Sequence, residues 1–170
     1  MSSRSITTAS SATRDLRPGD WPEVEAIFRD GIATGVATFE ERPPSWEEWD
    51  AAHTDVRVVA ELEGRVAGWC ALSPVSDRCC YRGVAEESVY VASRAQGRGV
   101  GRGLLSTLVA RSEAAGIWTL EAGIFPENKP SLRLHLGCGF RLVGVRERIG
   151  ELEGEWRDVL LLERRTELIG

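Results

Sequence analysis

A glycine-rich segment, Gln96-Gly97-Arg98-Gly99-Val100-Gly101-Arg102-Gly103, carries the strongest chemical signal in the sequence. Its four glycines are a poor start for a helix, because each costs about 1 kcal/mol relative to alanine in a helix interior. Glycine does let backbone N–H groups approach a ligand, and a helix N-terminus offers unpaired donors with a partial positive charge. Phosphate suits such a turn, and Arg98 and Arg102 add charge. The segment predicts an anion site, with a plain flexible turn as the alternative.

Two common nucleotide-binding loops do not fit this segment. A Walker loop requires Lys followed by Ser or Thr after its last glycine, and neither pair follows here. A Rossmann turn requires G-x-G-x-x-G, but Arg102 stands where the third glycine counted from Gly97 would be. We therefore exclude both loop types.

The predicted elements show what must hold this turn in place. Apolar spacing and turn residues predict the order β-α-α-β-β-β-α-β-α-β-β. Strands are expected at 13–17, in a hairpin within 56–72, and at 84–91, 117–124, 140–145 and 156–162; helices are expected at 20–32, from 45, and at 103–115 and 131–136. Asp20, Ser45 with Glu48, and Asn128 are predicted helix caps, and Gly116 a helix stop. We expect a mixed sheet covered by helices, with a ligand where the central strands part.

The turn fits the pattern Q/R-x-x-G-x-G/A from Gln96 to Gly101, which resembles the pyrophosphate loop of the GNAT superfamily of N-acetyltransferases. Val89-Tyr90-Val91 and Asn128-Lys129-Pro130-Ser131 match two further segments of that superfamily in order. The resemblance implies an α/β (α+β) fold with a mixed, mostly antiparallel sheet, a splayed central strand pair and helices on both faces. It implies acetyl-CoA as co-substrate, bound by Val89, Tyr90, Val91, Gln96, Gly97, Arg98, Gly99, Val100, Gly101, Arg102, Asn128 and Ser131.

Finer motifs resemble the phosphinothricin and methionine sulfoximine acetyltransferase branch. They are Ala37-Thr38-Phe39-Glu40, Tyr81 to Val91, Ser131 to His135, and Gly154 to Val159, with departures at Val84-Ala85 and between His135 and Phe140. The resemblance implies direct acetyl transfer to the amino group of a small substrate of the phosphinothricin, methionine sulfoximine or methionine sulfone type, and a homodimer. A protein N-terminal or polyamine acetyltransferase, and a CoA-binding sensor without activity, stay open as alternatives.

Acetyl transfer requires a neutral amine, so a base must remove a proton from the ammonium form. Glu86 and Glu87 are the candidates, and strand alternation leads us to expect only one of them in the cleft. The resemblance places Glu86 at the glutamate of the family, and we predict Glu86 as the base. A β-bulge that re-aims the pair, and two solvent-facing charges, are the alternatives.

His135 shares a helix face with Ser131, and it matches the family histidine near the acetyl group, which implies a proton relay. A packing histidine is the alternative. The resemblance also implies a substrate pocket that includes Phe39, Tyr81, Arg82, Glu86, Glu87 and Ser88. Arg82 is predicted to hold a substrate carboxylate through two hydrogen bonds, with an ordinary surface arginine as the alternative.

The composition is that of one soluble domain: 170 residues, 42% hydrophobic and 28% charged. A net charge of −5 argues against nucleic acid as a partner, and the apolar stretches are too short for a membrane span. We expect a disordered tail at 1–12 without a secretory signal, a single domain at 13–165 and a short tail at 166–170. The four cysteines lack zinc-site spacing, so we expect no metal and reduced thiols in the cytoplasm.

Overall fold

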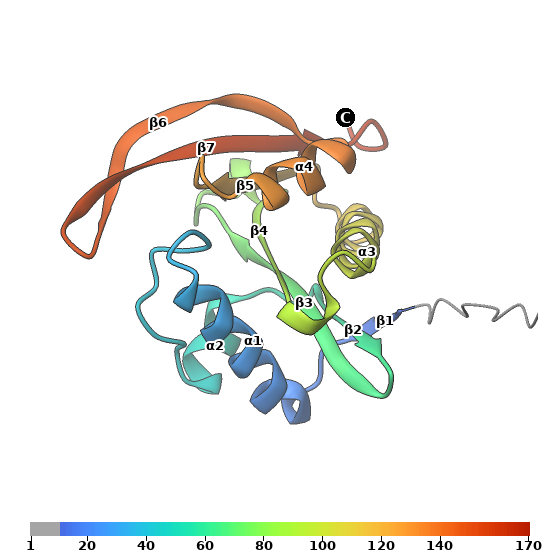
Figure 1. Cartoon of the computed structure of the whole chain (residues 1–170). Coiled ribbons are helices and arrows are strands. Elements are labelled where there is room, and N and C mark those ends of the chain that lie inside the picture. Colours follow the sequence, from blue (N-terminus) through green and yellow to red (C-terminus); the bar gives the residue numbers. More distant parts are fainter. Residues whose placement is uncertain (1–10) are drawn as a thin grey trace, which may run out of the picture.

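The computed structural model describes residues 11–170, which form a seven-stranded sheet with helices on both faces (Figure 1). The strands are β1 (Ala12–Asp15), β2 (Arg57–Leu62), β3 (Arg65–Pro74), β4 (Val84–Val91), β5 (Thr119–Ile124), β6 (Arg141–Leu152) and β7 (Glu155–Arg165). The α-helices are α1 (Trp21–Ala33), α2 (Trp46–Ala52), α3 (Val100–Ala114) and α4 (Lys129–Gly137), and 3₁₀ turns lie at Pro18–Asp20, Cys79–Tyr81 and Ser93–Ala95. The predicted order of strands and α-helices is confirmed. Residues 1–10 of the predicted N-terminal tail lie outside the described residues.

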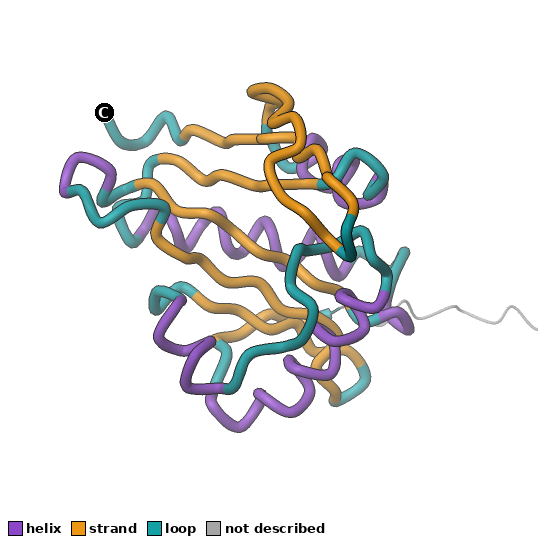
Figure 2. Tube along the Cα trace, turned by 90° about the vertical axis from the view of Figure 1, so that its left-hand side faces the viewer, coloured by secondary structure: helices purple, strands orange, loops and turns teal. Residues whose placement is uncertain are grey.

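The sheet has the strand order β1-β2-β3-β4-β5-β7-β6, and its strands lie side by side with helices in front and behind (Figure 2). Every pairing is antiparallel except that of β4 with β5. The parallel pair is short, because only Val84–Glu86 pairs with Thr119–Glu121 before the two strands separate. The predicted mixed, mostly antiparallel sheet with a splayed central strand pair is therefore confirmed.

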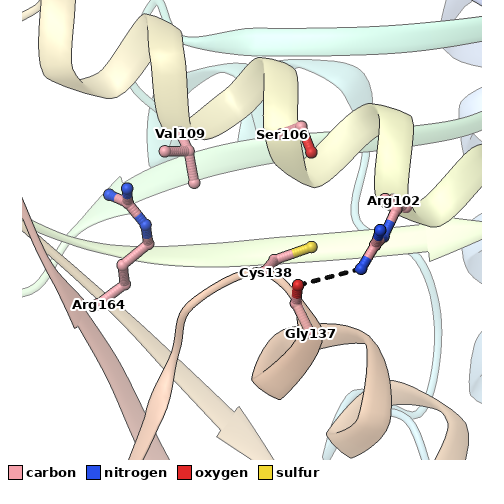
Figure 3. A pocket seen from close by; sticks show the side chains of 6 residues that line it. All are labelled: Arg102, Ser106, Val109, Gly137, Cys138 and Arg164. Atoms are coloured by element: carbon pink, nitrogen blue, oxygen red, sulfur yellow. Dashed lines mark hydrogen bonds between the residues drawn. The ribbon is translucent and has the colours of Figure 1, made fainter.

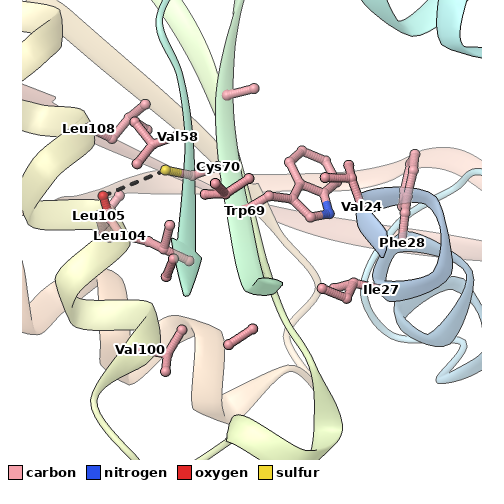
Figure 4. Packing of buried hydrophobic residues seen from close by; sticks show 14 of the residues in the cluster. Val24, Ile27, Phe28, Val58, Trp69, Cys70, Val100, Leu104, Leu105 and Leu108 are labelled. Carbon is pink, nitrogen blue, oxygen red and sulfur yellow. Dashed lines mark hydrogen bonds between the residues drawn. The ribbon is translucent and has the colours of Figure 1, made fainter. Parts of the chain in front are cut away.

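Two apolar layers fix the helices on opposite faces of the sheet (Figure 4). Alternation along β3 places Trp69 on the α1 face and Cys70 on the α3 face, where the Cys70 thiol lies 3.5 Å from the carbonyl oxygen of Leu104. The buried apolar side chains that α1 and α3 contribute are Val24, Ile27, Phe28, Val100, Leu104, Leu105 and Leu108. The spacing of three and four residues that predicted these helices is thus the spacing of their buried faces.

The helix ends follow local sequence signals with one exception. Ser45 and Glu48 form the predicted capping box, with Ser45 Oγ accepting from the Glu48 N–H at 3.2 Å and Glu48 Oε2 accepting from the Ser45 N–H at 2.9 Å. Gly116, with φ of +81°, follows the end of α3 as expected. Asp20 is the N-cap residue of α1 as predicted, but its carboxylate makes no capping hydrogen bond and binds the Arg14 guanidinium at 2.7 Å instead.

The last two strands differ from their predicted limits. They were expected at 140–145 and 156–162, but β6 runs to Leu152 and β7 to Arg165, and together they form a long curved hairpin (Figure 1). Most side chains of β6 are exposed, so this strand lacks the regular alternation of apolar and polar residues that marks a half-buried strand. The part of the hairpin that the sequence pattern did not predict forms one wall of the main cavity.

Candidate active site

A cavity of about 1050 Å³ opens where β4 and β5 separate. Its walls come from the loop after α1, from β4, from the glycine turn, from the start of α4 and from the β6–β7 hairpin. The predicted site residues that line it are Phe39, Glu86, Glu87, Ser88, Val89, Tyr90, Val91, Gln96, Gly97, Gly99, Val100, Gly101, Arg102, Asn128, Ser131 and His135. Tyr81, Arg82 and Arg98 do not line it.

The glycine turn needs glycine for two separate reasons. Gly97 and Gly99 have φ of +72° and +80°, a left-handed conformation that side chains with a Cβ rarely adopt. Gly101 sits where α3 approaches α4, and a Cβ there would lie 3.1 Å from Leu134 Cδ2. Helix α3 starts at Val100, so its first N–H groups, which have no partner inside the helix, lie at the cavity wall. This turn offers an anion both backbone donors and the positive end of a helix.

The two arginines of the turn point in different directions. Arg98 forms an ion pair with Glu63 at 2.9 Å and turns toward the β2–β3 hairpin, away from the cavity. Arg102 lines the cavity and donates one hydrogen bond to the carbonyl oxygen of Gly137 at 3.2 Å. Of these two arginines, only Arg102 therefore lines the cavity.

Asn128 and Ser131 lie at the start of α4, facing the same cavity. The Asn128 side-chain oxygen accepts a hydrogen bond from the Ser131 N–H at 3.2 Å, which confirms the predicted cap. The cap orients the first turn of α4, and that turn places His135 one helical turn further along the same face.

Glu86 and Glu87 point to opposite faces of the sheet, yet both line the cavity. Glu86 Oε1 lies 3.9 Å from the point where a Cβ on Gly123 would stand, whereas Glu87 reaches His135 on α4. Both residues lie on β4 where its pairing with β5 ends, at the mouth of the gap between the two strands. The Glu86 side chain is exposed and that of Glu87 is buried, so only Glu86 opens into the cleft, as strand alternation led us to expect.

The Glu86 carboxyl has a raised pKa. Desolvation by the surrounding protein atoms is the largest cause, and the charges of Glu87 and Glu121 act in the same direction. Arg146 opposes them in part. Glu86 keeps contact with solvent through the cavity, so it can accept a proton from a bound molecule, and a raised pKa makes it a better base near neutral pH.

Glu87 and His135 form a buried pair, with His135 Nε2 lying 2.5 Å from Glu87 Oε1. His135 Nδ1 lies 2.7 Å from the carbonyl oxygen of Ser131, and because a carbonyl only accepts, Nδ1 must carry a proton. One further proton is then shared between Nε2 and Oε1. Burial lowers the pKa of His135, but the hydrogen bond and charge of Glu87 outweigh burial, so the pKa is raised overall. Glu87 Oε2 is buried and has no partner within residues 11–170.

Two predicted substrate residues lie outside the cavity. The Arg82 guanidinium stacks over the Trp118 ring at 5.4 Å and donates to the carbonyl oxygen of Cys79 at 3.3 Å. Tyr81 is exposed, with the Arg78 guanidinium 5.5 Å from its ring. In the described part of the chain, neither side chain reaches Glu86 or the glycine turn.

Besides Glu40 and Glu127, one positively charged cavity residue was not predicted from the sequence to lie in the site, Arg146. It lies on β6 one position beyond the predicted end of that strand, opposite Val159 of β7. Its position could have been found only by extending the hairpin, because nothing in the local pattern separates Arg146 from the neighbouring arginine at 148.

Aromatic packing holds the loop after α1 against the hairpin. Phe39 meets Phe125 edge to face at 4.8 Å and packs against Gly150, where an added Cβ would be 2.7 Å from the ring. Arg157 stacks over Phe125 at 4.6 Å and pairs with Glu127 at 3.2 Å. Phe39 is thereby fixed as a cavity wall, as predicted.

A second cavity, of about 300 Å³, lies between α3, the end of α4 and β7 (Figure 3). It is lined by Arg102, Ser106, Val109, Gly137, Cys138 and Arg164. Burial raises the pKa of the Cys138 thiol, which disfavours a reactive thiolate. These lining residues include no carboxylate and no imidazole, so we assign the acid–base chemistry to the larger cavity.

Among residues 11–170, no group of three or more His, Cys, Asp or Glu side chains is arranged to hold a metal ion. No helix in this same part of the chain is long and apolar enough to cross a membrane.

Comparison with known proteins gives concordant matches. The model of the "Acetyltransferase (GNAT) family" matches residues 21–140. A phosphinothricin N-acetyltransferase of Alcaligenes faecalis is 39% identical, covering 89% of this chain and 80% of its own length. An L-methionine sulfoximine/L-methionine sulfone acetyltransferase of Pseudomonas aeruginosa is 29% identical, covering 91% and 94%. The crystal structure of a phosphinothricin acetyltransferase from Sinorhizobium meliloti in complex with acetyl-CoA is 34% identical, covers 92% and 88%, and superposes with a TM-score of 0.83.

Proposed function

Because the chain belongs to the acetyltransferase (GNAT) family and is an acetyl-CoA-dependent N-acetyltransferase, we propose that it transfers acetyl directly to the α-amino group of a phosphinothricin, methionine sulfoximine or methionine sulfone type of acceptor. The observation that carries the proposal is the cavity through the gap between β4 and β5. It joins an anion-binding turn to a carboxylate of raised pKa. The named activities of the relatives support an amino-acid-like acceptor.

The co-substrate binds along the side of β4 that β5 leaves free. Beyond Glu86 the backbone of β4 has no partner on β5, so Val89 to Val91 can pair with the amide groups of the pantetheine arm. The glycine turn and Arg102 bind the pyrophosphate, and Asn128 and Ser131 line the wall opposite.

Glu86 acts as the general base. Glu86 takes a proton from the ammonium group directly or through water, and the neutral nitrogen then attacks the thioester carbon. The C–S bond breaks and coenzyme A leaves as a thiolate, which takes up the second proton lost by the nitrogen to become the free thiol. A backbone N–H of the free part of β4 donates to the thioester oxygen while negative charge develops there. The buried pair of Glu87 and His135 holds its shared proton on the other face of the same strand.

A thiol-release assay tests this function. The enzyme is given acetyl-CoA and, separately, phosphinothricin, methionine sulfoximine, methionine sulfone, common amino acids, spermidine and short peptides. Saturable release with one of the first three supports the proposal. Release only with peptides points to protein N-termini, and binding of acetyl-CoA without any turnover points to a CoA sensor; either result refutes it.

A polyamine acceptor is the second candidate, and the cavity lining favours it in one respect. Four glutamates face the cavity, and a polycation suits an acidic wall. Glu87 pairs with His135 and Glu127 with Arg157, however, so the two remaining glutamates, Glu40 and Glu86, share the cavity with two arginines, Arg102 and Arg146. Faster turnover of spermidine than of any amino acid would establish the polyamine function.

The enzyme acts as a homodimer in this proposal, with β6 in the interface. Strand β6 is an edge of the described sheet, and it exposes Leu142, Val143, Val145 and Ile149. An exposed apolar edge strand is a surface that a second chain can cover. Light scattering after size exclusion should give twice the monomer mass, and Val145→Lys should reduce it. A monomer at every concentration would contradict the dimer.

Cytoplasmic location stays a prediction from the sequence.

A further inference from the structure

Arg146 faces the acceptor end of the cavity. It pairs across the hairpin with Val159, and Val159 Cγ1 lies 3.3 Å from the point where a Cβ on Gly123 would stand. Glu86 Oε1 lies 3.9 Å from that same point. Opposed residues of an antiparallel pair share a face, so Arg146 and Glu86 border the same part of the cavity.

No ion pair holds the Arg146 guanidinium within residues 11–170, although its charge acts on the Glu86 carboxyl. Its side chain also forms no hydrogen bond in this part of the chain, although it lines the cavity. The other cavity arginine, Arg102, lies at the glycine turn, and Arg157 is engaged by Glu127. Arg146 is therefore the guanidinium available at the end where Glu86 stands.

An α-amino acid carries an ammonium group and a carboxylate one carbon apart, so its site needs an acceptor and a cation close together. Resting on the proposed function, we infer that Arg146 binds the carboxylate of the amino-acid acceptor while Glu86 faces its amino group. Arg82, which the sequence analysis predicted for this role, is turned to Trp118 and lies outside the cavity. A guanidinium can bind a carboxylate through two parallel hydrogen bonds, which a lysine cannot reproduce.

The test compares an acceptor amino acid with its carboxamide, which keeps the amine and loses the negative charge. Arg146→Gln should raise the KM for the amino acid about 10- to 100-fold, the effect of losing a hydrogen bond between charged groups. Its KM for the carboxamide and for acetyl-CoA should change less than about threefold, so the preference for the free acid disappears. Arg146→Lys should restore part of that preference, because lysine brings back the positive charge but cannot form two parallel hydrogen bonds to the carboxylate.

Two matched variants keep the result specific. Arg148→Gln makes the same charge change on β6 at a residue that does not line the cavity, and it should behave as the unchanged enzyme. An unchanged preference for the free acid in Arg146→Gln overturns the inference, as does its loss in Arg82→Gln instead. If the unchanged enzyme acetylates no α-amino acid, the proposed function itself is overturned, and this inference with it.

Discussion

Removing His135 alone should destabilise the fold more than removing both members of the buried Glu87–His135 pair. The two side chains are 3% and 2% exposed, so solvent does not screen their interaction at 2.5 Å. Glu87→Leu, His135→Leu and the double variant keep similar volumes while they remove one or both polar groups. The three variants therefore form a cycle that isolates the interaction between the pair.

The expected losses follow from what each variant leaves behind. His135→Leu leaves an unpaired buried carboxylate, and such changes cost about 3–5 kcal/mol of unfolding free energy. Glu87→Leu leaves one unpaired nitrogen but also removes the unpartnered Oε2, which offsets about 1–3 kcal/mol of that cost. Its loss should be the smaller, at about 2 kcal/mol. The double variant removes both groups and should be more stable than His135→Leu alone.

Urea denaturation at pH 6 and pH 8 measures these differences. In the unchanged protein the raised pKa of His135 contributes stability that is full below its unfolded pKa and lost as pH rises through the folded pKa. Additive losses within about 0.5 kcal/mol would refute the reasoning, because additivity means that the two groups do not interact.

Further predictions concern the base and two glycines. Glu86→Gln should lower kcat about 10²- to 10⁴-fold without changing the Kd for acetyl-CoA, and an unchanged kcat would remove Glu86 from the mechanism. Because the pKa of Glu86 is raised, kcat/KM should fall with decreasing pH at a higher pH than an ordinary carboxyl would give. For the same reason, Glu86→Gln should raise Tm at pH 8 and not at pH 4, and a lower Tm at pH 8 would contradict this sign. Gly101→Ala should lower the free energy of unfolding measured in urea by about 1–3 kcal/mol, because its Cβ would meet Leu134 at 3.1 Å. Gly103→Ala should instead stabilise α3, because only Ser11 Oγ, at 3.7 Å, lies near its Cβ. Equal effects of the two variants would refute the packing argument. Gly150→Ala should displace Phe39 and raise the KM for the acceptor but not for acetyl-CoA, and a shift in both would show that the hairpin itself has moved.

Local chemistry explains why much of this fold was predictable from the sequence. Three features could be predicted because each depends on only a few neighbouring residues: the capping box at Ser45, the helix stop at Gly116, and the apolar spacing of α1 and α3. The glycine turn was predictable for the same reason, because the left-handed conformations at Gly97 and Gly99 depend on the local sequence. Glu86 and His135 could be named from motifs at fixed spacing, and both line the cavity.

Tertiary structure decided what those residues contact. Glu87 and His135 are 48 positions apart, and only the packing of α4 against β4 makes them a buried pair. Arg82 and Arg146 look equally charged in the sequence, yet the turn before β4 directs Arg82 to Trp118, while the hairpin carries Arg146 to the cavity. The cavity opens where β4 and β5 stop pairing after Glu86, and that separation leaves the Glu86 carboxyl open to it. Periodicity reports which face of an element is apolar, but the partner across a gap depends on how separate elements come together.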